Sequence, residues 1–293
     1  MIYTNNLNLP QALYNAVVEG EKRVHNSDAT VTELTNAPRP FYLKRRHNDE
    51  ITIDISDRLF TIYGRMVHTV MEKYAPEDTI TEERLRCNVN GWQVSGQPDL
   101  MDEKQISDWK LTSSWVIIFD SNREEYARQL NLYRYLAKQN GFGDIDRLEN
   151  IFLLRDWSRT KAKHDAGYPQ KPVEIVQQAV HPYDDVGKWL DTRVREFQNL
   201  IACPDDNLPV CSPEARWRKP DSWALKKEGR KTAIKVCSNE GEAKTLCAQK
   251  YKGADSIEYR PGIDLRCHSY CDAKNFCSYY RSLVRAAPEP EEE

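Results

Sequence analysis

The feature that most constrains the fold of this chain is an ordered change in the spacing of apolar residues between residues 56 and 154. Apolar residues first recur at steps of three and four after Ser56, which is typical of an amphipathic helix. Three strand-like runs follow, and Asn90-Gly91 between the first two is a strong hairpin signal. The expected elements are a helix over 56–74, strands over 80–89, 92–100 and 105–111, a helix over 123–138 and a strand over 149–154. This order predicts an α/β fold in which helices flank a mixed sheet.

Prolines and composition predict how the chain divides. Pro38 and Pro40 favour a turn or a helix end, and prolines again flank a linker over 204–213. Before this linker we expect a strand over 173–180 and a helix over 183–201. Beyond it we expect a hairpin of 223–225 with 232–236, a helix over 240–250 and a strand over 256–260. We therefore expect a core domain with an N-terminal helical segment over 1–203, a cysteine-rich region over 204–287 and an acidic tail over 288–293.

Asp108-Trp109-Lys110, in the third strand-like run, carries the strongest chemical signal. Alternate residues of a strand point to one face, so Asp108 and Lys110 project together. The preceding run ends at Asp99, and a hairpin of this length can bring Asp99 beside Asp108. Two carboxylates beside an ammonium can hold Mg²⁺ or Mn²⁺, and the lysine can orient or help deprotonate a metal-bound water. The similar triplets at 102–104, 242–244 and 272–274 lie outside strand-like runs and are interpreted as exposed charge pairs.

Two helical pairs extend this constellation. Gly64 and His68 are four residues apart on the helix before the strands, so they share a face. A glycine there favours close approach of the sheet, and His68 can supply a nitrogen ligand to the same metal. Gln129 and Tyr133 share a face of the helix after the third run. Taken alone, each pair is an ordinary helical surface.

In this order, these residues resemble the PD-(D/E)XK nuclease superfamily. The closest resemblance is to its RecB-like exonuclease branch, to which CRISPR-associated and phage-encoded exonucleases belong. The matching elements are Pro38-Arg39-Pro40-Phe41-Tyr42-Leu43, Gly64-x-x-x-His68, Gly96-x-Pro98-Asp99, Asp108-Trp109-Lys110 and Gln129-x-x-x-Tyr133. These motifs span roughly residues 35 to 135, and the resemblance implies a restriction-endonuclease-like core.

The resemblance also implies roles for these residues. Asp99 and Asp108 would bind Mg²⁺ or Mn²⁺, together with His68 and the Trp109 backbone carbonyl, and Lys110 would position the attacking water. The residues that would support the site and contact the DNA strand are Gln129 and Tyr133. The resulting hypothesis is a metal-dependent DNA exonuclease in recombination, repair or phage DNA processing. A catalytically silent DNA-binding or interaction module of the same fold and a sequence-specific endonuclease of the superfamily are the alternatives.

Cysteines concentrate near the end of the chain, where three thiols fall within eleven residues, at Cys267, Cys271 and Cys277. Some RecB-like nucleases carry a four-cysteine iron–sulfur cluster, with three ligands near the C-terminus and one upstream. Here Ala37 stands at the upstream position, so the resemblance leaves the fourth ligand open. We favour Cys211, in a proline-flanked turn, and a [4Fe–4S] cluster. The other candidates for the fourth ligand are Cys203, Cys87, Cys237 and Cys247. Zinc held by four thiolates, or no metal at all, are the alternatives.

Charge does not exclude a nucleic-acid partner, although 42 Lys and Arg stand against 45 Asp and Glu, for a net charge of -3. Four glutamates in residues 288–293 more than account for this deficit. Basic clusters at 44–46 and 216–231, with Trp217 and Trp223 nearby, predict either a single-strand track or a solvated basic surface. The expected partners are DNA single strands or duplex ends, with recombination or replication proteins. No apolar run approaches the ~20 residues of a membrane helix, and no signal peptide is evident, so we expect a cytoplasmic protein.

Overall fold

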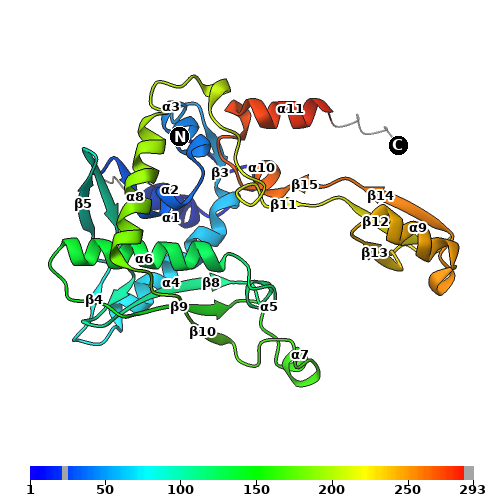
Figure 1. Ribbon diagram of the computed structural model, residues 1–293, viewed down its shortest axis with the longest axis horizontal. Coiled ribbons are helices and arrows are strands. Elements are labelled where there is room, and N and C mark those ends of the chain that lie inside the picture. The colour runs from blue at the N-terminus through cyan, green and yellow to red at the C-terminus, as the bar shows by residue number, and fades with distance from the viewer. Residues whose placement is uncertain (22–25, 287–293) are drawn as a thin grey trace. The chain divides into compact units, whose positions relative to one another are not determined.

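The computed structural model describes residues 1–21 and 26–286, and the chain forms two compact units (Figure 1). Unit 1 comprises Met1–Pro38 and Asn48–Cys203, and unit 2 comprises Arg39–His47 and the chain from Pro204 onward. A short early segment therefore belongs with the C-terminal part. The expected acidic tail over 288–293 lies outside the described residues.

Unit 1 is built on a five-stranded sheet in the order β10-β9-β8-β7-β4. The strands are β4 (Ile80–Thr81), β7 (Leu100–Met101), β8 (Gln105–Thr112), β9 (Arg147–Leu154) and β10 (Val173–Gln177). β8 and β9 are parallel, whereas the other neighbours are antiparallel. Helices contact this sheet, so the prediction of an α/β fold with a mixed sheet flanked by helices is confirmed.

A second, three-stranded sheet of unit 1 contains β2 (Ala29–Thr30), β6 (Trp92–Gly96) and β5 (Leu85–Val89). Asn90 and Gly91 join β5 to β6 and both have positive φ, at 51° and 81°. Positive φ at both central residues is what a type I′ hairpin turn requires, and Asn-Gly tolerates it best. The hairpin expected at this dipeptide is therefore present. A short parallel pair of β1 (Ile2–Thr4) and β3 (Thr52–Asp54) completes the strands of unit 1.

Two runs expected as single strands are each divided between these two sheets. The expected strand over 80–89 is interrupted after β4, where Glu82 has a φ of 49°, a conformation that disfavours a continuous ladder. The expected strand over 92–100 is interrupted at Pro98, which has no backbone N–H to donate. The chain thus crosses between the sheets at two nearby points, next to Glu82 and next to Asp99.

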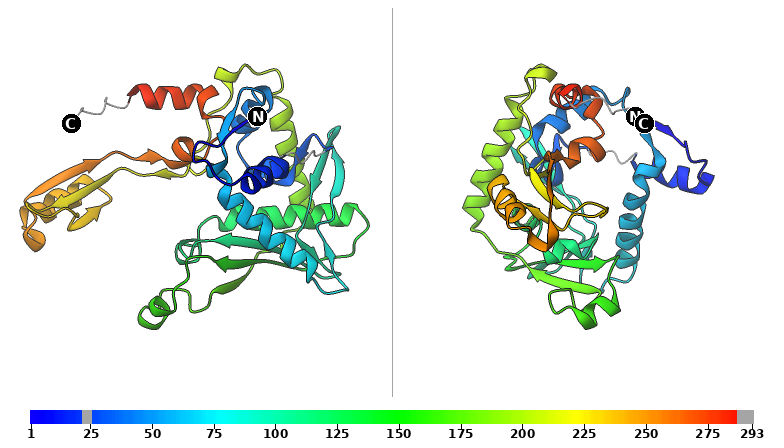
Figure 2. Two further views of the ribbon diagram at one scale, coloured as in Figure 1. Left: turned by 180° about the vertical axis from the view of Figure 1, so that it is seen from behind. Right: turned by 90° about the vertical axis from the view of Figure 1, so that its right-hand side faces the viewer.

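The main helix of unit 1 is α6 (Arg123–Gln139), which packs on β8 and β9 and is visible along the sheet in Figures 1 and 2. Leu130, Leu132 and Leu136 are fully buried, because the sheet covers one side of α6 and α8 (Tyr183–Gln198) covers another. α4 (Leu59–Lys73) contacts β8 and carries His68. The other helices of unit 1 are α1 (Gln11–Glu21), α2 (Val31–Thr35), η1 (Ile55–Arg58), α5 (Trp115–Ile118) and α7 (Arg159–His164).

The segment after residue 37 is expected to be a turn or a helix end, and the structure has the helix end, because Pro38–Arg46 forms the helix α3 with both prolines in its first turn. Pro38 takes the first helical position and Pro40 the third. The first four N–H groups of a helix have no acceptor within the helix, so a proline there removes no hydrogen bond. Both prolines are therefore compatible with the start of α3.

Unit 2 contains a small module in which β12 (Ser222–Lys226) pairs with β13 (Lys235–Cys237) and β14 (Ser256–Arg260). α9 (Glu240–Ala248) covers this sheet, and Leu225, Cys237, Ala243 and Ala254 form its buried core. The hairpin, helix and strand expected here are all present. The remaining elements are η2 (Asp205–Asn207), β11 (Arg218–Lys219), η3 (Tyr251–Gly253), β15 (Ile263–Asp264), α10 (Leu265–Ser269), η4 (Lys274–Phe276) and α11 (Ser278–Ala286).

Within residues 1–21 and 26–286, every helix is too short or too polar to cross a membrane.

Candidate active site

The candidate site lies on β8, where strand alternation places Asp108 and Lys110 on one face. Leu100 of β7 pairs with Ser107 of β8, so Asp99, just before β7, lies at the level of Asp108. The Trp109 backbone N–H donates a hydrogen bond of 2.8 Å to Asp99 Oδ2. The hairpin thus places the two carboxylates side by side, and it anchors Asp99 through the N–H of Trp109.

Asp108 forms a buried ion pair with Lys110. Lys110 Nζ lies 2.9 Å from Asp108 Oδ1 and 2.7 Å from Oδ2, and Asp108 is only 2% exposed. On the parallel strand β9, Asn150 is paired with Asp108 and donates a hydrogen bond of 2.9 Å to Asp108 Oδ2. Gln178 in turn donates to Asn150 Oδ1 at 2.9 Å. Asn150 is a site residue that sequence reasoning missed, because only the β8–β9 register reveals it.

The protonation of this pair follows from burial and from neighbouring charges. Burial raises the pKa of Asp108, the Asp99 carboxylate raises it further, and the Lys110 ammonium opposes both effects. Burial lowers the pKa of Lys110, but the adjacent Asp108 carboxylate outweighs it, so the net pKa of Lys110 is raised. Lys110 is therefore held as an ammonium. Asp99 and Asp108 repel each other in a way that a bound cation would relieve.

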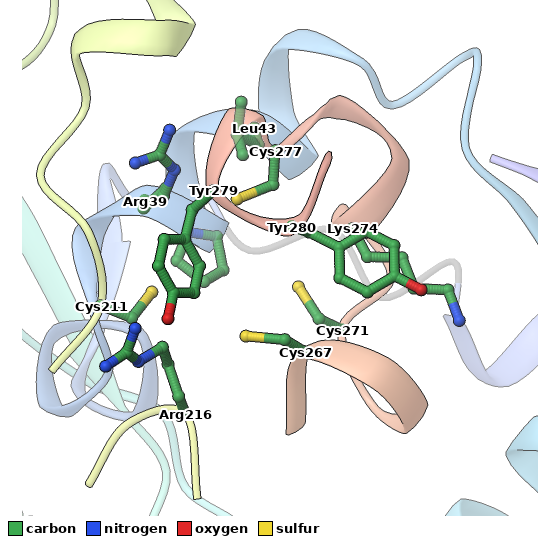
Figure 3. A pocket seen from close by; sticks show the side chains of 11 residues that line it. Arg39, Leu43, Cys211, Arg216, Cys267, Cys271, Lys274, Cys277, Tyr279 and Tyr280 are labelled. Carbon is green, nitrogen blue, oxygen red and sulfur yellow. The ribbon is translucent and has the colours of Figure 1, made fainter. Parts of the chain in front are cut away.

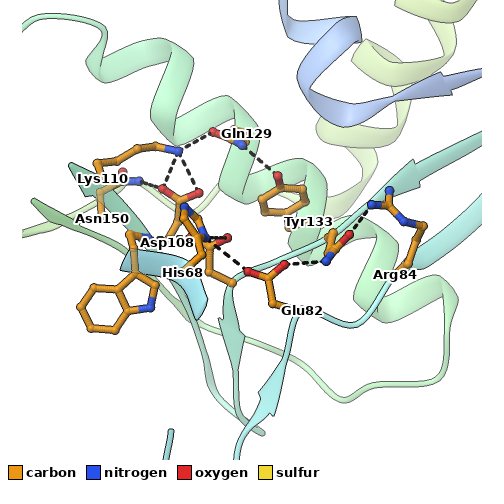
Figure 4. A network of polar contacts seen from close by, with 11 residues as sticks. His68, Glu82, Arg84, Asp108, Lys110, Gln129, Tyr133 and Asn150 are labelled. Carbon is orange, nitrogen blue, oxygen red and sulfur yellow. Dashed lines mark hydrogen bonds and ion pairs between the residues drawn. The ribbon is translucent and has the colours of Figure 1, made fainter. Parts of the chain in front are cut away.

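Gln129 and Tyr133 continue the network from α6 (Figure 4). Lys110 Nζ lies 3.4 Å from Gln129 Oε1, and Gln129 Nε2 donates to the Tyr133 hydroxyl at 2.8 Å. Burial raises the pKa of Tyr133 to about 12, so its phenol stays neutral. These two residues therefore lie against the ion pair and hold Lys110 on the side facing α6.

His68, Glu82 and Asp99 form the second half of the site. One ligand atom of each lies within 4.8 Å of those of the other two, and within 1–21 and 26–286 no other group of three or more His, Cys, Asp or Glu residues meets this criterion. His68 Nδ1 lies 3.3 Å from Glu82 Oε1 and 3.2 Å from Asp99 Oδ1. One imidazole nitrogen and two carboxylates are donors that suit a hard divalent cation. Asp108 lies outside this group, and its oxygens contact Lys110 and Asn150.

Glu82 is the second residue that sequence reasoning missed. It follows β4 at the break between the two sheets, in a run that the sequence predicts as one strand. Gln97, at the other sheet crossing, donates a hydrogen bond of 2.5 Å to Glu82 Oε2, and Arg84 donates to Gln97 (Figure 4). The two crossings therefore orient Glu82 toward His68. The Thr81-Glu82-Glu83 acidic step is a weak sequence signal that alone does not identify a ligand.

The two glycines of the motifs differ in their surroundings. A Cβ added to Gly96 would lie 2.8 Å from Tyr133 Cδ1, so this glycine admits the Tyr133 ring to the site. A Cβ added to Gly64 would have no atom within 4 Å. The expectation that Gly64 permits close approach of the sheet is therefore wrong, since no neighbouring element packs against that position.

The four cysteines singled out near the end line one pocket in unit 2 (Figure 3). Cys267, Cys271 and Cys277 come from the C-terminal segment, and Cys211 comes from the segment after η2. All four are free thiols, and their sulfurs turn into the pocket. Arg39 of α3, only 2% exposed, also lines the pocket and donates to Leu208 O and Ser278 Oγ, both at 2.6 Å. The pocket thus joins α3 to both cysteine-bearing segments.

The thiols are close enough to influence one another. Burial raises the pKa of Cys211 to about 11 and that of Cys267 to about 12, and the charges of the neighbouring thiolates contribute in both cases. No three of the four sulfurs lie mutually within 4.8 Å. Elsewhere, Cys237 is a core residue of the small module, and Cys247 packs against that core. These two are packing residues and lie outside the pocket.

The expected basic clusters are partly engaged within unit 2. Lys44 pairs with Asp272 at 2.5 Å, and Arg46 pairs with Asp205 at 2.7 Å. Trp223 is half-buried against the core of the small module, whereas Trp217 is 41% exposed. Residues 44–46 therefore help to assemble unit 2, and the exposed Trp217 is itself contacted by Tyr270 and by the Arg266 guanidinium.

Comparison with known proteins gives structural likeness alone. No family model matches the chain, and no curated protein matches it in sequence. The crystal structure of SSO0001 is similar at 15% identity, with a TM-score of 0.43, over 66% of this chain and 86% of that one. A protein of Eubacterium rectale, provisionally named an exonuclease, is similar at 10% identity, with a TM-score of 0.30, over 63% and 71% of the two chains. Structural similarity this distant does not support a function, so the function is inferred from the residues of the site.

The contacts of His68 predict a pH dependence of stability in the protein stripped of metal by a chelator. Hydrogen bonds that His68 donates to the Asp99 and Glu82 carboxylates raise the pKa of His68 from 6.5 to about 10. A raised pKa in the folded state stabilises that state fully below pH 6.5, and this stabilisation is lost as the pH rises towards 10. Urea titrations across this range should show the loss in the wild-type protein and a reduced loss in His68→Gln. The exposed His164→Gln is the control; if both variants follow the wild-type profile, the His68 contacts do not exist in solution.

Proposed function

We propose that unit 1 is a metal-dependent deoxyribonuclease that hydrolyses phosphodiester bonds and acts as an exonuclease. The observation that carries the proposal is the convergence of His68, Glu82 and Asp99 on one small space beside the Asp108–Lys110 pair. Isolated acid-x-Lys triplets are common, but a buried one joined to a histidine–carboxylate cluster is not explained by surface charge pairing. The side chains of the site come from β8, α4, α6 and the two sheet crossings, so the fold brings them together from distant parts of unit 1.

The proposed metal ligands are His68, Glu82 and Asp99, with Asp108 at the edge of the cluster. Oxygen donors with one imidazole fit Mg²⁺ or Mn²⁺ better than a soft metal. A divalent cation bound there would activate a water molecule and neutralise charge on the phosphate. The Trp109 backbone carbonyl stays a predicted fourth donor, and the Trp109 N–H keeps Asp99 in place.

Lys110 and its neighbours act on the phosphate and the attacking water. Because Asp108 holds Lys110 as an ammonium, Lys110 stabilises negative charge that develops on the phosphate and orients a water molecule through an N–H donor. Gln129 and the neutral Tyr133 hydroxyl lie next to Lys110 and provide polar groups for the adjoining sugar–phosphate. DNA as substrate, and cleavage from an end, are supported by the motif resemblance to RecB-like exonucleases. A role in recombination, repair or phage DNA processing, with partner proteins from these processes, follows from the same resemblance.

A nuclease assay on end-labelled DNA tests this proposal. We expect the purified protein to release nucleotides with Mg²⁺ or Mn²⁺ and not with a chelator, and we expect Asp108→Asn and Lys110→Met to lower the rate by roughly a hundredfold or more. Lys104→Met, in the exposed Asp102-x-Lys104 triplet, is the matched control and should keep the wild-type rate.

The same assay separates the alternatives. Absence of cleavage of single- and double-stranded DNA with either metal would contradict catalysis and support a silent DNA-binding module. Cleavage of closed circular DNA would contradict the requirement for an end and support an endonuclease.

We also propose that Cys211, Cys267, Cys271 and Cys277 hold a thiolate-bound metal group, and favour a [4Fe–4S] cluster over zinc. Four thiols that line one pocket provide the complete ligand set of either group. The preference for a [4Fe–4S] cluster is supported by the resemblance to RecB-like nucleases that carry one. The group would stabilise unit 2, since its ligands come from two distant segments.

Replacing one ligand tests this second proposal. Cys271→Ser should lower the folded yield and remove most of the bound iron and acid-labile sulfide of anaerobically purified protein, because thiolate ligation contributes directly to folding. Cys87→Ser, a half-buried cysteine outside the pocket, should retain both. Zinc in place of iron would select the alternative, and wild-type yield with no metal in either protein would contradict the assignment.

A further inference from the structure

Unit 1 exposes four large aromatic side chains in two touching pairs. Phe60 and Tyr63 of α4 are 63% and 44% exposed, and their ring centroids lie 5.8 Å apart in a T-shaped arrangement. Trp115 of α5 is 57% exposed, and Phe119, the residue that follows α5, is 67% exposed. Their rings stack, with centroids 5.3 Å apart and ring planes 8° from parallel. Each pair leaves ring surface in contact with water, which is unfavourable unless a ligand covers it.

Arg155 contacts one of the two pairs and lies beside the strand end that leads to the other. Its guanidinium lies 4.6 Å from the centroid of the Phe60 ring, and its backbone N–H donates at 2.9 Å to Thr112 O at the end of β8. Trp115 follows three residues after Thr112 in the chain. Phe60, Tyr63, Trp115, Phe119 and Arg155 therefore gather around the end of β8, and we call them the aromatic platform.

The position of the platform is fixed by hydrogen bonds beneath it. Asp156 accepts from the Ser114 backbone N–H at 2.6 Å and from Ser114 Oγ at 2.8 Å. The buried Tyr168 hydroxyl lies 3.0 Å from Ser114 Oγ. These contacts anchor the start of α5, so the Trp115–Phe119 stack is held by the body of unit 1.

The platform adjoins the candidate active site through two elements. On β8, Lys110 lies two residues before Thr112. On α4, His68 lies eight residues after Phe60, which corresponds to about 12 Å along a helix. A chain molecule that lies on the platform is thus within reach of the Asp108–Lys110 pair.

One neighbour of the platform is a basic helix. β8 and β9 are parallel, so α5 and α7 follow the same end of the sheet (Figure 1). α7 contributes the exposed Arg159, Lys161 and Lys163 and contains no acidic residue. Asp156 accepts hydrogen bonds from Ser113 and Ser114, and Asp120 faces Arg123 at 3.3 Å, whereas the flanking segments also expose Glu124, Glu125 and Asp165. Positive charge and open aromatic rings together match a polyanion with accessible bases.

We propose that the aromatic platform stacks the unpaired bases of a single DNA strand and leads that strand into the active site. The inference rests on the proposed nuclease function and adds the form of its substrate. A duplex conceals the faces of its bases, so only a single strand, or the frayed end of a duplex, can cover these rings. The basic side chains of α7 would contact the phosphates of the same strand.

Binding to two strands of equal length tests the proposal on the full-length protein in a chelator, where no hydrolysis occurs. One probe is a fluorescein-labelled oligothymidine, and the other is an abasic strand with the same phosphates. Trp115→Ala combined with Phe119→Ala should weaken oligothymidine binding about tenfold or more, because stacking contributes about 1–3 kcal/mol per base, and 1.4 kcal/mol is tenfold. Binding of the abasic strand should change little. Tyr74→Ala, an aromatic residue 74% exposed just after α4, is the matched control and should bind as the wild-type protein does.

Three outcomes would overturn the platform. The first is unchanged oligothymidine binding in the double variant, and the second is an equal loss of binding for both strands. The third is a wild-type dimer that forms with rising concentration and is absent from the double variant, because this would identify the surface as a contact between copies of the chain. A parallel hydrolysis assay with Mg²⁺ or Mn²⁺ separates this result from the nuclease proposal. If the wild-type protein cleaves DNA but the double variant shows no selective loss of oligothymidine binding, the platform proposal alone is refuted. If the double variant shows the selective loss but the wild-type protein does not cleave DNA, the nuclease proposal alone is refuted.

Discussion

The buried ion pair of Asp108 and Lys110 is the interaction around which unit 1 is organised. Replacing such a pair with apolar residues is often neutral or stabilising, whereas removing one partner alone costs about 3–5 kcal/mol. Stability is therefore a weak reason to keep two charges inside a sheet. The pair is oriented by Asn150 from the parallel strand and by Gln129 from α6, and both contacts depend on the βαβ arrangement of β8, α6 and β9. This arrangement favours a chemical role for the pair.

The division of two strand runs between two sheets creates the other half of the site. Where the chain crosses between sheets, its backbone leaves the ladder and its polar side chains can converge. One crossing contributes Glu82, and the other contributes Gln97 and Asp99. His68 then meets both carboxylates from α4. The cluster of His68, Glu82 and Asp99 therefore results from an interruption of regular structure, at a positive φ in one run and at a proline in the other.

Most of unit 1 was predictable from the spacing of apolar residues, because the periods of 3.6 and 2 differ clearly over segments of this length. The Asn90-Gly91 turn and the shared face of Asp108 and Lys110 followed from local geometry. Glu82 and Asn150 did not, because they reach the site through sheet crossing and strand register, which no local pattern encodes. Pro38 left a turn and a helix end both open, since proline suits either, and only the structure shows that it begins a helix. In unit 2, the cysteine spacing indicated three partners and the proline-flanked turn indicated Cys211, and the fold places all four in one pocket.

Mn²⁺ binding measured by electron paramagnetic resonance is the most direct test of the central claim, that His68, Glu82 and Asp99 bind a catalytic cation. Glu82 is the informative residue, because no sequence motif implicated it. The account predicts that the wild-type protein binds Mn²⁺, that Glu82→Gln weakens this binding by about tenfold or more, and that Glu83→Gln, at the exposed neighbouring position, leaves it unchanged. Equal Mn²⁺ affinity in the wild-type protein and in Glu82→Gln, or no binding in either, would contradict it.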